Sequence, residues 1–181
     1  MGHAMRRAAR QNTVSASITD SFDRADSTTT MGTTDTGQTW VPNTGTWGIS
    51  SNRAYVVSGS QATTVVESNL ADCTIQVTAA VVQNGGLCWR STNNSNHWLM
   101  APTVVFKKVA GGFTQVGASF SGLTNGTVIK IILSGNDGYL YFDGVLKLSW
   151  SDSFNATATK HGLRELSGGG SARFDSFSIV P

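Results

Sequence analysis

Apolar and polar residues alternate along most of the chain after about residue 18. The alternation is clearest in one run, which consists of Cys73, Ile75, Val77, Ala79 and Val81. A period of two places successive side chains on opposite faces of a β-strand, so this run predicts a strand over residues 73–82 with one buried face.

The closing segment, residues 171–180, has the same alternation with one irregularity. Phe174, Phe177 and Ile179 keep the period of two apart from a slip of one residue. One extra residue on one strand of a pair is typical of a β-bulge. We therefore expect a bulged strand at this end of the chain.

Short alternating segments recur between turn residues. Asp143-Gly144, which lies between Tyr-Phe and Val-Leu, predicts a tight hairpin. The run from Val128 to Leu133 is almost continuously apolar, which is typical of a strand buried on both faces. The predicted strands cover residues 46–50, 53–58, 62–68, 73–82, 86–91, 97–101, 103–109, 112–120, 127–134, 138–143, 145–150, 161–166 and 171–180.

Composition favours the same fold class. Only 13% of the 181 residues are charged, and Glu67 and Glu165 are the only glutamates. Helix surfaces normally need far more Glu and Lys, whereas short strands joined by tight turns do not. The chain is therefore predicted to be all-β, and its length suits one domain.

The charge is uneven. Residues 1–19 contain Arg6, Arg7 and Arg10 and no acid, while the remainder of the chain is close to neutral. The domain has no basic stripe, so we expect no nucleic-acid partner. No apolar run approaches the ~18 residues of a membrane-spanning helix, and no apolar segment follows the arginines, so neither membrane insertion nor a secretory signal is expected.

Cys73 and Cys88 flank what we expect to be a hairpin that turns at Asn84-Gly85. Pairing across that turn puts Cys88 opposite about Val81, eight positions from Cys73. At ~3.3 Å per residue the two sulfurs would lie ~25 Å apart, which is beyond disulfide reach. We expect two buried thiols, in a protein made in a reducing cytoplasm.

A set of short phrases in a fixed order resembles a known family. They are DSFDRADSTTTMG (20–32), Trp40, GTWGISSNRAYV (45–56), GLCWRSTNNSNHW (86–98), GYLYFDGVLKLSW (138–150) and ARFDSFSIV (172–180). In this order they resemble the concanavalin A-like (laminin-G/lectin-type) jelly-roll domains, particularly those of bacteriophage head decoration or minor tail proteins.

The resemblance implies a jelly-roll β-sandwich of two antiparallel sheets over residues 18–181, preceded by an extended or partly helical arm over residues 1–17. It also implies that Phe22, Trp40 and Trp47 are core aromatics that seal one end of the sandwich. It says little about activity, because one fold carries many unrelated functions.

Glycoside hydrolases occur on the fold that the resemblance implies, so the arrangement of the carboxylates bears on whether this chain is an enzyme. A retaining enzyme needs two carboxyl groups ~5 Å apart, often from alternate positions of one strand. Glu67 and Glu165 stand alone, and no serine, cysteine or histidine occurs in a nucleophile pattern. No zinc-ligand spacing is present either. We therefore expect a protein without enzymatic activity.

Calcium is also considered as a ligand, because lectin-type sandwiches often bind it. Asp20, Asp23 and Asp26 cluster in sequence, and Asp175 could approach them if the first and last strands pair. A structural turn and an ion pair between Asp23 and Arg24 explain the same residues without a metal, and this reading is favoured.

Glycan binding is the family-implied alternative, in which an exposed aromatic ring stacks on a sugar and amide or carboxylate groups bind its hydroxyls. Trp98 beside the Asn-rich loop is the preferred platform, and an ordinary half-buried tryptophan is an equal alternative. For His97, a place in a surface loop that returns to a strand is favoured over a ligand site. Trp89 is assigned to the core. The candidates are Trp98, His97, Asn93, Asn94, Asn96 and Tyr139, with Trp89, Tyr141, Trp150 and Asp137 also considered.

The leading hypothesis is a capsid decoration protein on the virion surface, oligomeric on the particle and bound to the major capsid protein or other virion proteins. Arginines suit charge-assisted docking of an arm. The alternatives are a minor tail or baseplate protein, or a carbohydrate-binding module for host or environmental glycans. The expected arm contacts are Met1, Met5, Arg6, Arg7, Arg10 and Val14.

Overall fold

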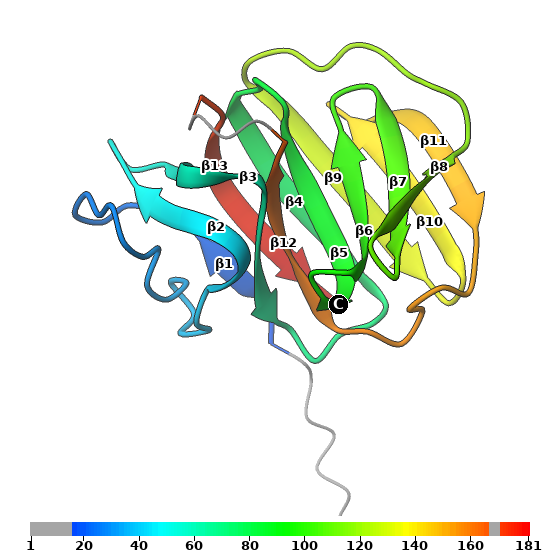
Figure 1. Cartoon of the computed structure of the whole chain (residues 1–181), viewed down its shortest axis with the longest axis horizontal. Coiled ribbons are helices and arrows are strands. Elements are labelled where there is room, and N and C mark those ends of the chain that lie inside the picture. The colour runs from blue at the N-terminus through cyan, green and yellow to red at the C-terminus, as the bar shows by residue number, and fades with distance from the viewer. Residues whose placement is uncertain (1–15, 167–170) are drawn as a thin grey trace, which may run out of the picture.

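The computed structural model describes residues 16–166 and 171–181. In this part of the chain all regular secondary structure is β-strand (Figure 1). The strands are β1 (Ile18–Asp20), β2 (Val41–Ile49), β3 (Ala54–Glu67), β4 (Cys73–Val81), β5 (Gly85–Asn93), β6 (Asn96–Ala101), β7 (Val104–Val109), β8 (Gly112–Val116), β9 (Thr127–Ser134), β10 (Asp137–Phe142), β11 (Val145–Ser151), β12 (Lys160–Glu165) and β13 (Arg173–Val180).

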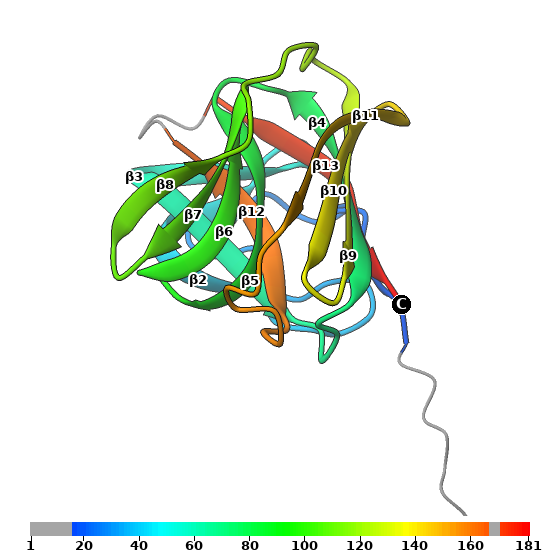
Figure 2. The same ribbon diagram turned by 90° about the vertical axis from the view of Figure 1, so that its right-hand side faces the viewer.

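The strands form two facing layers, which are seen edge-on in Figure 2. The front sheet has the order β2-β3-β12-β5-β6-β7-β8, and the back sheet has the order β1-β13-β4-β9-β10-β11. All pairings between strands are antiparallel, and a single residue pair, Phe174 with Ala54, connects the two sheets. The predicted all-β jelly-roll sandwich is confirmed.

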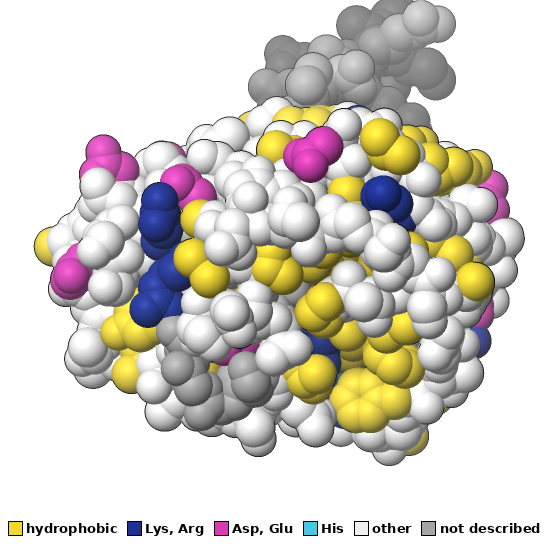
Figure 3. Space-filling model, turned by 90° about the horizontal axis from the view of Figure 1, so that it is seen from above, with side chains coloured by type: hydrophobic (Ala, Val, Ile, Leu, Met, Phe, Trp, Pro, Cys, Tyr) yellow, Lys and Arg dark blue, Asp and Glu magenta, His cyan; other side chains and the backbone are white. Residues whose placement is uncertain are grey.

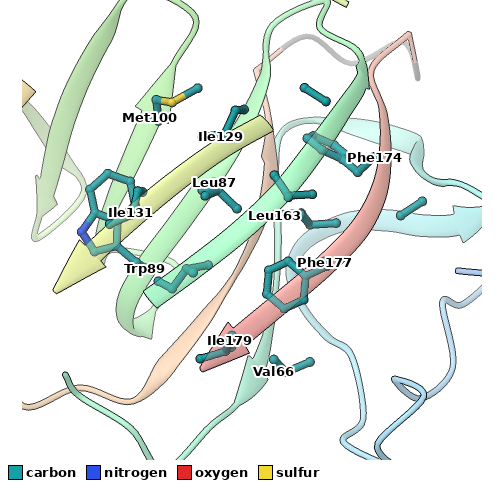
Figure 4. Packing of buried hydrophobic residues seen from close by; sticks show 14 of the residues in the cluster. Val66, Leu87, Trp89, Met100, Ile129, Ile131, Leu163, Phe174, Phe177 and Ile179 are labelled. Carbon is teal, nitrogen blue, oxygen red and sulfur yellow. The ribbon is translucent and has the colours of Figure 1, made fainter. Parts of the chain in front are cut away.

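The core lies between the layers, where apolar side chains from both sheets interdigitate (Figure 4). Phe22, Trp40 and Trp47 are buried there, as predicted. Trp40 contacts both Phe22 and Phe177, with ring centroids 6.0 and 5.0 Å apart. These rings close one end of an otherwise Gly- and Ser-rich shell.

The strand predictions hold closely, with identifiable exceptions. β13 has the expected bulge, because its pairing with β4 shifts between Asp175 and Ser178, and Ser176 adopts a positive φ of 53°. β3 is one long strand where two were predicted, and β1 was not predicted. β9 is buried on one face only, since Val128 and Ile132 are half-buried and the prediction of burial on both faces was wrong.

The hairpin expected between β4 and β5 is wrong. Asn84 does turn the chain, with a φ of 64°, but β4 pairs with β13 and β9 while β5 pairs with β12 and β6. The turn therefore carries the chain from the back sheet to the front sheet. Cys73 and Cys88 are free and buried, as predicted, and they belong to different sheets. Burial raises the pKa of each thiol to about 12, so both stay protonated at neutral pH.

The predicted hairpin at Asp143-Gly144 is confirmed. β10 and β11 pair from Phe142–Val145 onward, and φ is positive at both turn residues, 48° at Asp143 and 80° at Gly144. Positive φ at both central positions is typical of a type I′ turn, whose twist matches that of the flanking strands.

Candidate functional site

The outer face of the front sheet, which points away from the core, carries an apolar row of side chains with a hollow at each end. A row of side chains crosses it from strand to strand and forms a small apolar cluster separate from the main core. We call this row the floor. It consists of Val65 on β3, Cys88 on β5, Leu99 on β6 and Phe106 on β7.

The floor is recessed. Val65, Cys88 and Leu99 are at most 2% exposed, although no further sheet covers this face. Neighbouring side chains therefore cover this row, and a hollow lies at each end of it. The face is therefore hollowed rather than flat.

A glycine makes this close packing possible. Gly162 on β12 sits in the same row, paired with both Val65 and Cys88. A Cβ at this position would collide with the carbonyl oxygen of Thr64. Position 162 therefore has no room for a side chain. At this point the floor consists of backbone atoms alone.

One end of the floor opens into a hollow of about 380 Å³, which we call the Glu67 hollow. Val65 belongs to both the floor and this hollow. Most of its lining groups are amides, a hydroxyl, a carboxylate and an ammonium, which can bind sugar hydroxyls. The lining residues are Gln38, Thr39, Val41, Asn43, Val65, Glu67, Asn69 and Lys160.

Glu67 is held ionised in this hollow. Partial burial is the largest single influence and by itself would raise the pKa of its carboxyl, but hydrogen bonds from Thr159 and from the Asn69 N–H and the charge of Lys160 together outweigh it. The net pKa is below the ordinary value. A general acid needs a raised pKa, so Glu67 is suited to accepting hydrogen bonds rather than to donating a proton.

The other end of the floor opens into a second hollow of about 300 Å³, which we call the Arg164 hollow. Phe106 belongs to both the floor and this hollow. Figure 3, a view from above, shows hydrophobic side chains gathered at the lower right, with dark-blue atoms recessed between them. The lining residues are Gln61, Ala101, Phe106, Phe113, Arg164 and Leu166.

Trp98, the predicted sugar platform, is buried instead. It is 1% exposed, faces the core and donates its indole N–H to the carbonyl oxygen of Phe154 at 2.9 Å. Its ring stacks with Trp89 and Trp150, at centroid distances of 6.1 and 5.6 Å. The prediction that Trp98 is exposed was wrong, and the assignment of Trp89 to the core was correct. The polar loop beside Trp98 does not determine which face of β6 the ring occupies.

The asparagines of the β5–β6 turn are used within the turn. Asn93 accepts hydrogen bonds from the Ser95 N–H at 2.8 Å and from the Asn96 side-chain amide at 3.2 Å. Asn94 is half-buried, and His97 is 2% exposed. The structure therefore does not assemble these residues with Trp98 into an open sugar site.

His97 is neutral at physiological pH. Burial lowers its pKa to about 4, and the nearby charges of Lys108 and Arg164 act in the same direction, against a hydrogen bond to the Asn93 carbonyl. The interpretation of His97 as part of a surface loop was wrong, because its side chain lies on the recessed outer face of β6 beside these two cations.

Tyr139 and Asp137 do meet in a hollow, together with Trp150. It measures about 320 Å³ and lies at the β10–β11 edge of the back sheet, where Ser149 and Ser151 complete it. We call it the Tyr139 hollow. Tyr141 instead lies under the ammonium of Lys130, 4.9 Å from its ring centroid. Of the predicted glycan contacts, Tyr139, Asp137 and Trp150 therefore line one hollow together.

The four candidate calcium ligands serve as structural acceptors or remain apart. Asp20 is buried, pairs with Arg24 and accepts from the indole N–H of Trp40 at 2.7 Å. Asp26 accepts from the Ser51 N–H at 2.8 Å, and Asp175 lies 4.0 Å from Arg53. Asp23 is exposed, and Arg24 pairs with Asp20 rather than with it. Over residues 16–166 and 171–181 no group of three His, Cys, Asp or Glu side chains is arranged to hold a metal.

The predicted arm contacts, namely Met1, Met5, Arg6, Arg7, Arg10 and Val14, lie outside the described residues. Anchoring through this arm, the virion location and the oligomeric state stay predictions. Among the described residues, no helix has the length and hydropathy to cross a membrane.

Arg164, Phe106 and Phe113 were not identified as site residues from the sequence. Arg164 lies between Leu163 and Glu165 in a predicted strand, where a charged residue normally points to solvent. The signal that could have drawn attention to it is Gly162, because a glycine inside a strand often marks a close approach.

Comparisons with known proteins identify the fold. No family model and no curated protein sequence matches the chain. Carbohydrate binding module CBM66 from Bacillus subtilis superimposes with a TM-score of 0.60 at 18% identity, over 76% of this chain and 91% of that one. A Bacillus licheniformis β-glucanase superimposes with a TM-score of 0.58 at 13% identity, over 91% of this chain and 98% of that one.

The GH43 protein BlXynB from Bacillus licheniformis also superimposes, with a TM-score of 0.60 at 14% identity, over 90% of this chain but only 39% of that one. Such low identity shows the fold alone, a concanavalin A-like jelly roll. Both binding modules and glycoside hydrolases carry it, so the expected absence of enzymatic activity is neither confirmed nor excluded. None of these three is a virion protein, and the virion hypothesis stays a prediction.

Proposed function

We propose that this chain is a non-catalytic carbohydrate-binding domain whose ligand lies along the outer face of the front sheet. The observation that carries the proposal is the recessed floor, which joins the Glu67 hollow to the Arg164 hollow through Val65 and Phe106. A small-molecule site is typically lined by apolar side chains, with a few polar groups at defined positions.

The two hollows suit different parts of an extended ligand. The Glu67 hollow offers amide, carboxylate and ammonium groups for hydroxyls. The Arg164 hollow offers the ring of Phe113, which is 45% exposed, for contact with the apolar face of a sugar. An oligosaccharide combines both chemistries in one chain, so it fits this face better than a compact apolar ligand.

The absence of catalysis is part of the proposal, and the carboxylates support it. Within the described residues, Glu67 is the only acid that lines either hollow. Glu165, the other glutamate, directly follows Arg164 on β12 and is buried on the opposite face of that strand, since Arg164 points outward into its hollow. Hydrolysis requires two carboxyls within ~5 to 9.5 Å of each other, across the scissile bond.

The test is isothermal titration calorimetry of the full chain against a panel of soluble neutral and acidic polysaccharides. Phe113→Ala should weaken binding by about tenfold or more through lost stacking. Tyr139→Ala is the matched control, because it removes an aromatic ring from the competing hollow at the β10–β11 edge. Reducing-sugar release from the same panel should stay at the level of the blank.

Two outcomes would overturn the proposal. Loss of binding on Tyr139→Ala with Phe113→Ala unaffected would move the site to the Tyr139 hollow. Release of reducing sugar that is abolished by Glu67→Gln would make the chain a hydrolase.

A further inference from the structure

Arg164 is a buried cation that the protein leaves almost without partners. The residue is 3% exposed and lines the Arg164 hollow. Its one hydrogen bond in the described structure is to the carbonyl oxygen of Met100, at 3.1 Å. A guanidinium has five N–H donors, so most of its capacity is unused by the protein.

No carboxylate of the described residues forms an ion pair with Arg164. The ion pairs of the described residues involve Arg24, Arg53, Arg90 and Lys107, and none involves Arg164. Residues 1–15 and 167–170, which lie outside the described part, contain no Asp or Glu in their sequence. A side-chain carboxylate therefore cannot be supplied from those segments either.

A second cation lies beside the same hollow. The ammonium of Lys108 sits 5.2 Å from the ring centroid of Phe113, and Phe113 contacts Phe106 edge-on at 6.0 Å. Phe113 and Arg164 line the same hollow, so Lys108 lies at its edge, and burial together with the charge of Arg164 lowers the pKa of Lys108. Gathering like charges in a partly desolvated site is costly unless an anion joins them.

We propose that the Arg164 hollow binds the anionic group of an acidic glycan, a carboxylate or a sulfate, with Arg164 as its principal partner and Lys108 beside it. This inference rests on the proposed function and adds the substrate class. The guanidinium fork matches the paired oxygens of either group. The Phe113 ring would contact the sugar that carries the charge, while neutral units extend along the floor toward the Glu67 hollow.

The experiment is calorimetric titration of the full chain with four probes at low and at moderate salt. Polygalacturonate carries carboxylates, dextran sulfate carries sulfates, dextran is neutral, and poly-L-glutamate is a polyanion without sugar. Binding to one or both acidic glycans, with little binding to dextran or polyglutamate, is the expected result. Which of the two binds distinguishes carboxylate from sulfate as the recognised group.

The variants locate the effect. Arg164→Gln should weaken binding of the acidic glycan by about tenfold to a hundredfold, the usual range for a lost charge-assisted hydrogen bond. Lys108→Gln, at a half-buried position that tolerates change, should weaken it by a smaller factor. Lys130→Gln is the matched control, since Lys130 also covers an aromatic ring but lies on the back sheet.

Several results would overturn the inference. Equal binding of dextran and polygalacturonate, unchanged in Arg164→Gln and Lys108→Gln, would leave the proposed function standing without an anionic substrate. Equal binding of polyglutamate, or equal loss on Lys130→Gln, would indicate unspecific charge attraction. Failure to bind any of the probes, with no binding in the wider polysaccharide panel, would remove the proposed function together with this inference.

Discussion

Arg90 and Arg164 are both buried arginines of the front sheet, yet they lie in opposite kinds of surroundings. Arg90 donates to the Gly135 carbonyl at 2.7 Å and to Asp72 at 3.2 Å, with Ala71 as a further acceptor. Arg164 has the Met100 carbonyl alone among the described residues. The first arginine ties together loops of the two sheets, whereas the second faces a hollow with unused donors.

The same contrast holds for the aromatic residues around them. Near Arg90, three tryptophans pack against one another in a closed cluster, Trp89, Trp98 and Trp150. Near Arg164, Phe113 remains 45% exposed. We call the region that contains Arg90 and these three tryptophans the closed end. In this chain the type of a residue therefore does not separate structural groups from binding groups. The two kinds differ in how completely the protein itself satisfies the contacts of each side chain.

Replacing an aromatic in each region should give the largest effect and separate the two. Trp98→Ala removes a fully buried ring and its hydrogen bond, so the free energy of unfolding should fall by about 3–5 kcal/mol. Phe113→Ala should change it by about 0.5 kcal/mol or less, because the ring is largely at the surface. Urea denaturation followed by tryptophan fluorescence measures both. Similar losses in the two variants would abolish the distinction.

The arginines give the second test. Arg90→Met should lower the free energy of unfolding by about 2–4 kcal/mol, because three acceptor groups lose their partner. Arg164→Met should leave it within about 1 kcal/mol of wild type, since a poorly partnered buried charge is replaced by an apolar chain of similar length. The same denaturation curves measure this effect. A larger loss for Arg164 than for Arg90 would make Arg164 structural.

Gly162 tests the floor itself. A Cβ at this position meets the Thr64 carbonyl oxygen and lies 2.8 Å from the Cα of Val65. Gly162→Ala should therefore cost about 1–3 kcal/mol of stability and weaken glycan binding by displacing Val65. Gly112→Ala is the matched control, because its Cβ would meet the nearest atom, the Val109 carbonyl oxygen, at an ordinary 3.5 Å, and its φ is not positive. Unchanged stability of Gly162→Ala would show that the floor is not tightly packed.

Acid should weaken both regions modestly. Burial lowers the pKa of His161 and of His97 to about 4, whereas an unfolded histidine titrates near 6.5. The unfolded chain then binds more protons, so stability falls as the pH drops from about 6.5 toward 4 and is constant above that window with respect to these groups. The slope is at most about 1.4 kcal/mol per pH unit for each histidine.

His161, which bonds to the backbone of Arg90, accounts for the acid sensitivity of the closed end. Its Nε2–H donates to the Leu70 carbonyl at 2.8 Å, while its Nδ1 accepts from the Arg90 N–H at 3.2 Å. Protonation of Nδ1 would break the second bond. Thermal melts at pH 7 and pH 5 should show a smaller shift in His161→Gln than in wild type. An equal shift would assign the acid sensitivity to other groups.

Much of the fold was predictable because its signals are local. The period of two along β4, the slip in β13 and the Asp143-Gly144 turn all depend on neighbours in the sequence. The Asn84-Gly85 turn was predictable as a turn but not as a crossing between sheets. That outcome depends on β13 and β9, which pair with β4 from far along the chain.

The site was predictable only in small part, for the same reason. Exposure of Trp98 is decided by which face of β6 points to the core, and the adjoining loop carries no information about it. How few partners Arg164 has depends on which groups β3, β5 and β6 place around it, and the alternation of residues along β12 carries no information about them. Tyr139 and Asp137 were brought together because they occupy one strand.

The location of the glycan is the central claim, and amide chemical shifts measure it most directly. A ¹⁵N-labelled full chain titrated with the oligosaccharide that binds best should show its largest shifts at the amides of Val65, Gly162 and Phe106. The amide of Tyr139 should move least. Shifts concentrated at Tyr139 and Asp137, with the outer face of the front sheet unchanged, would contradict the account.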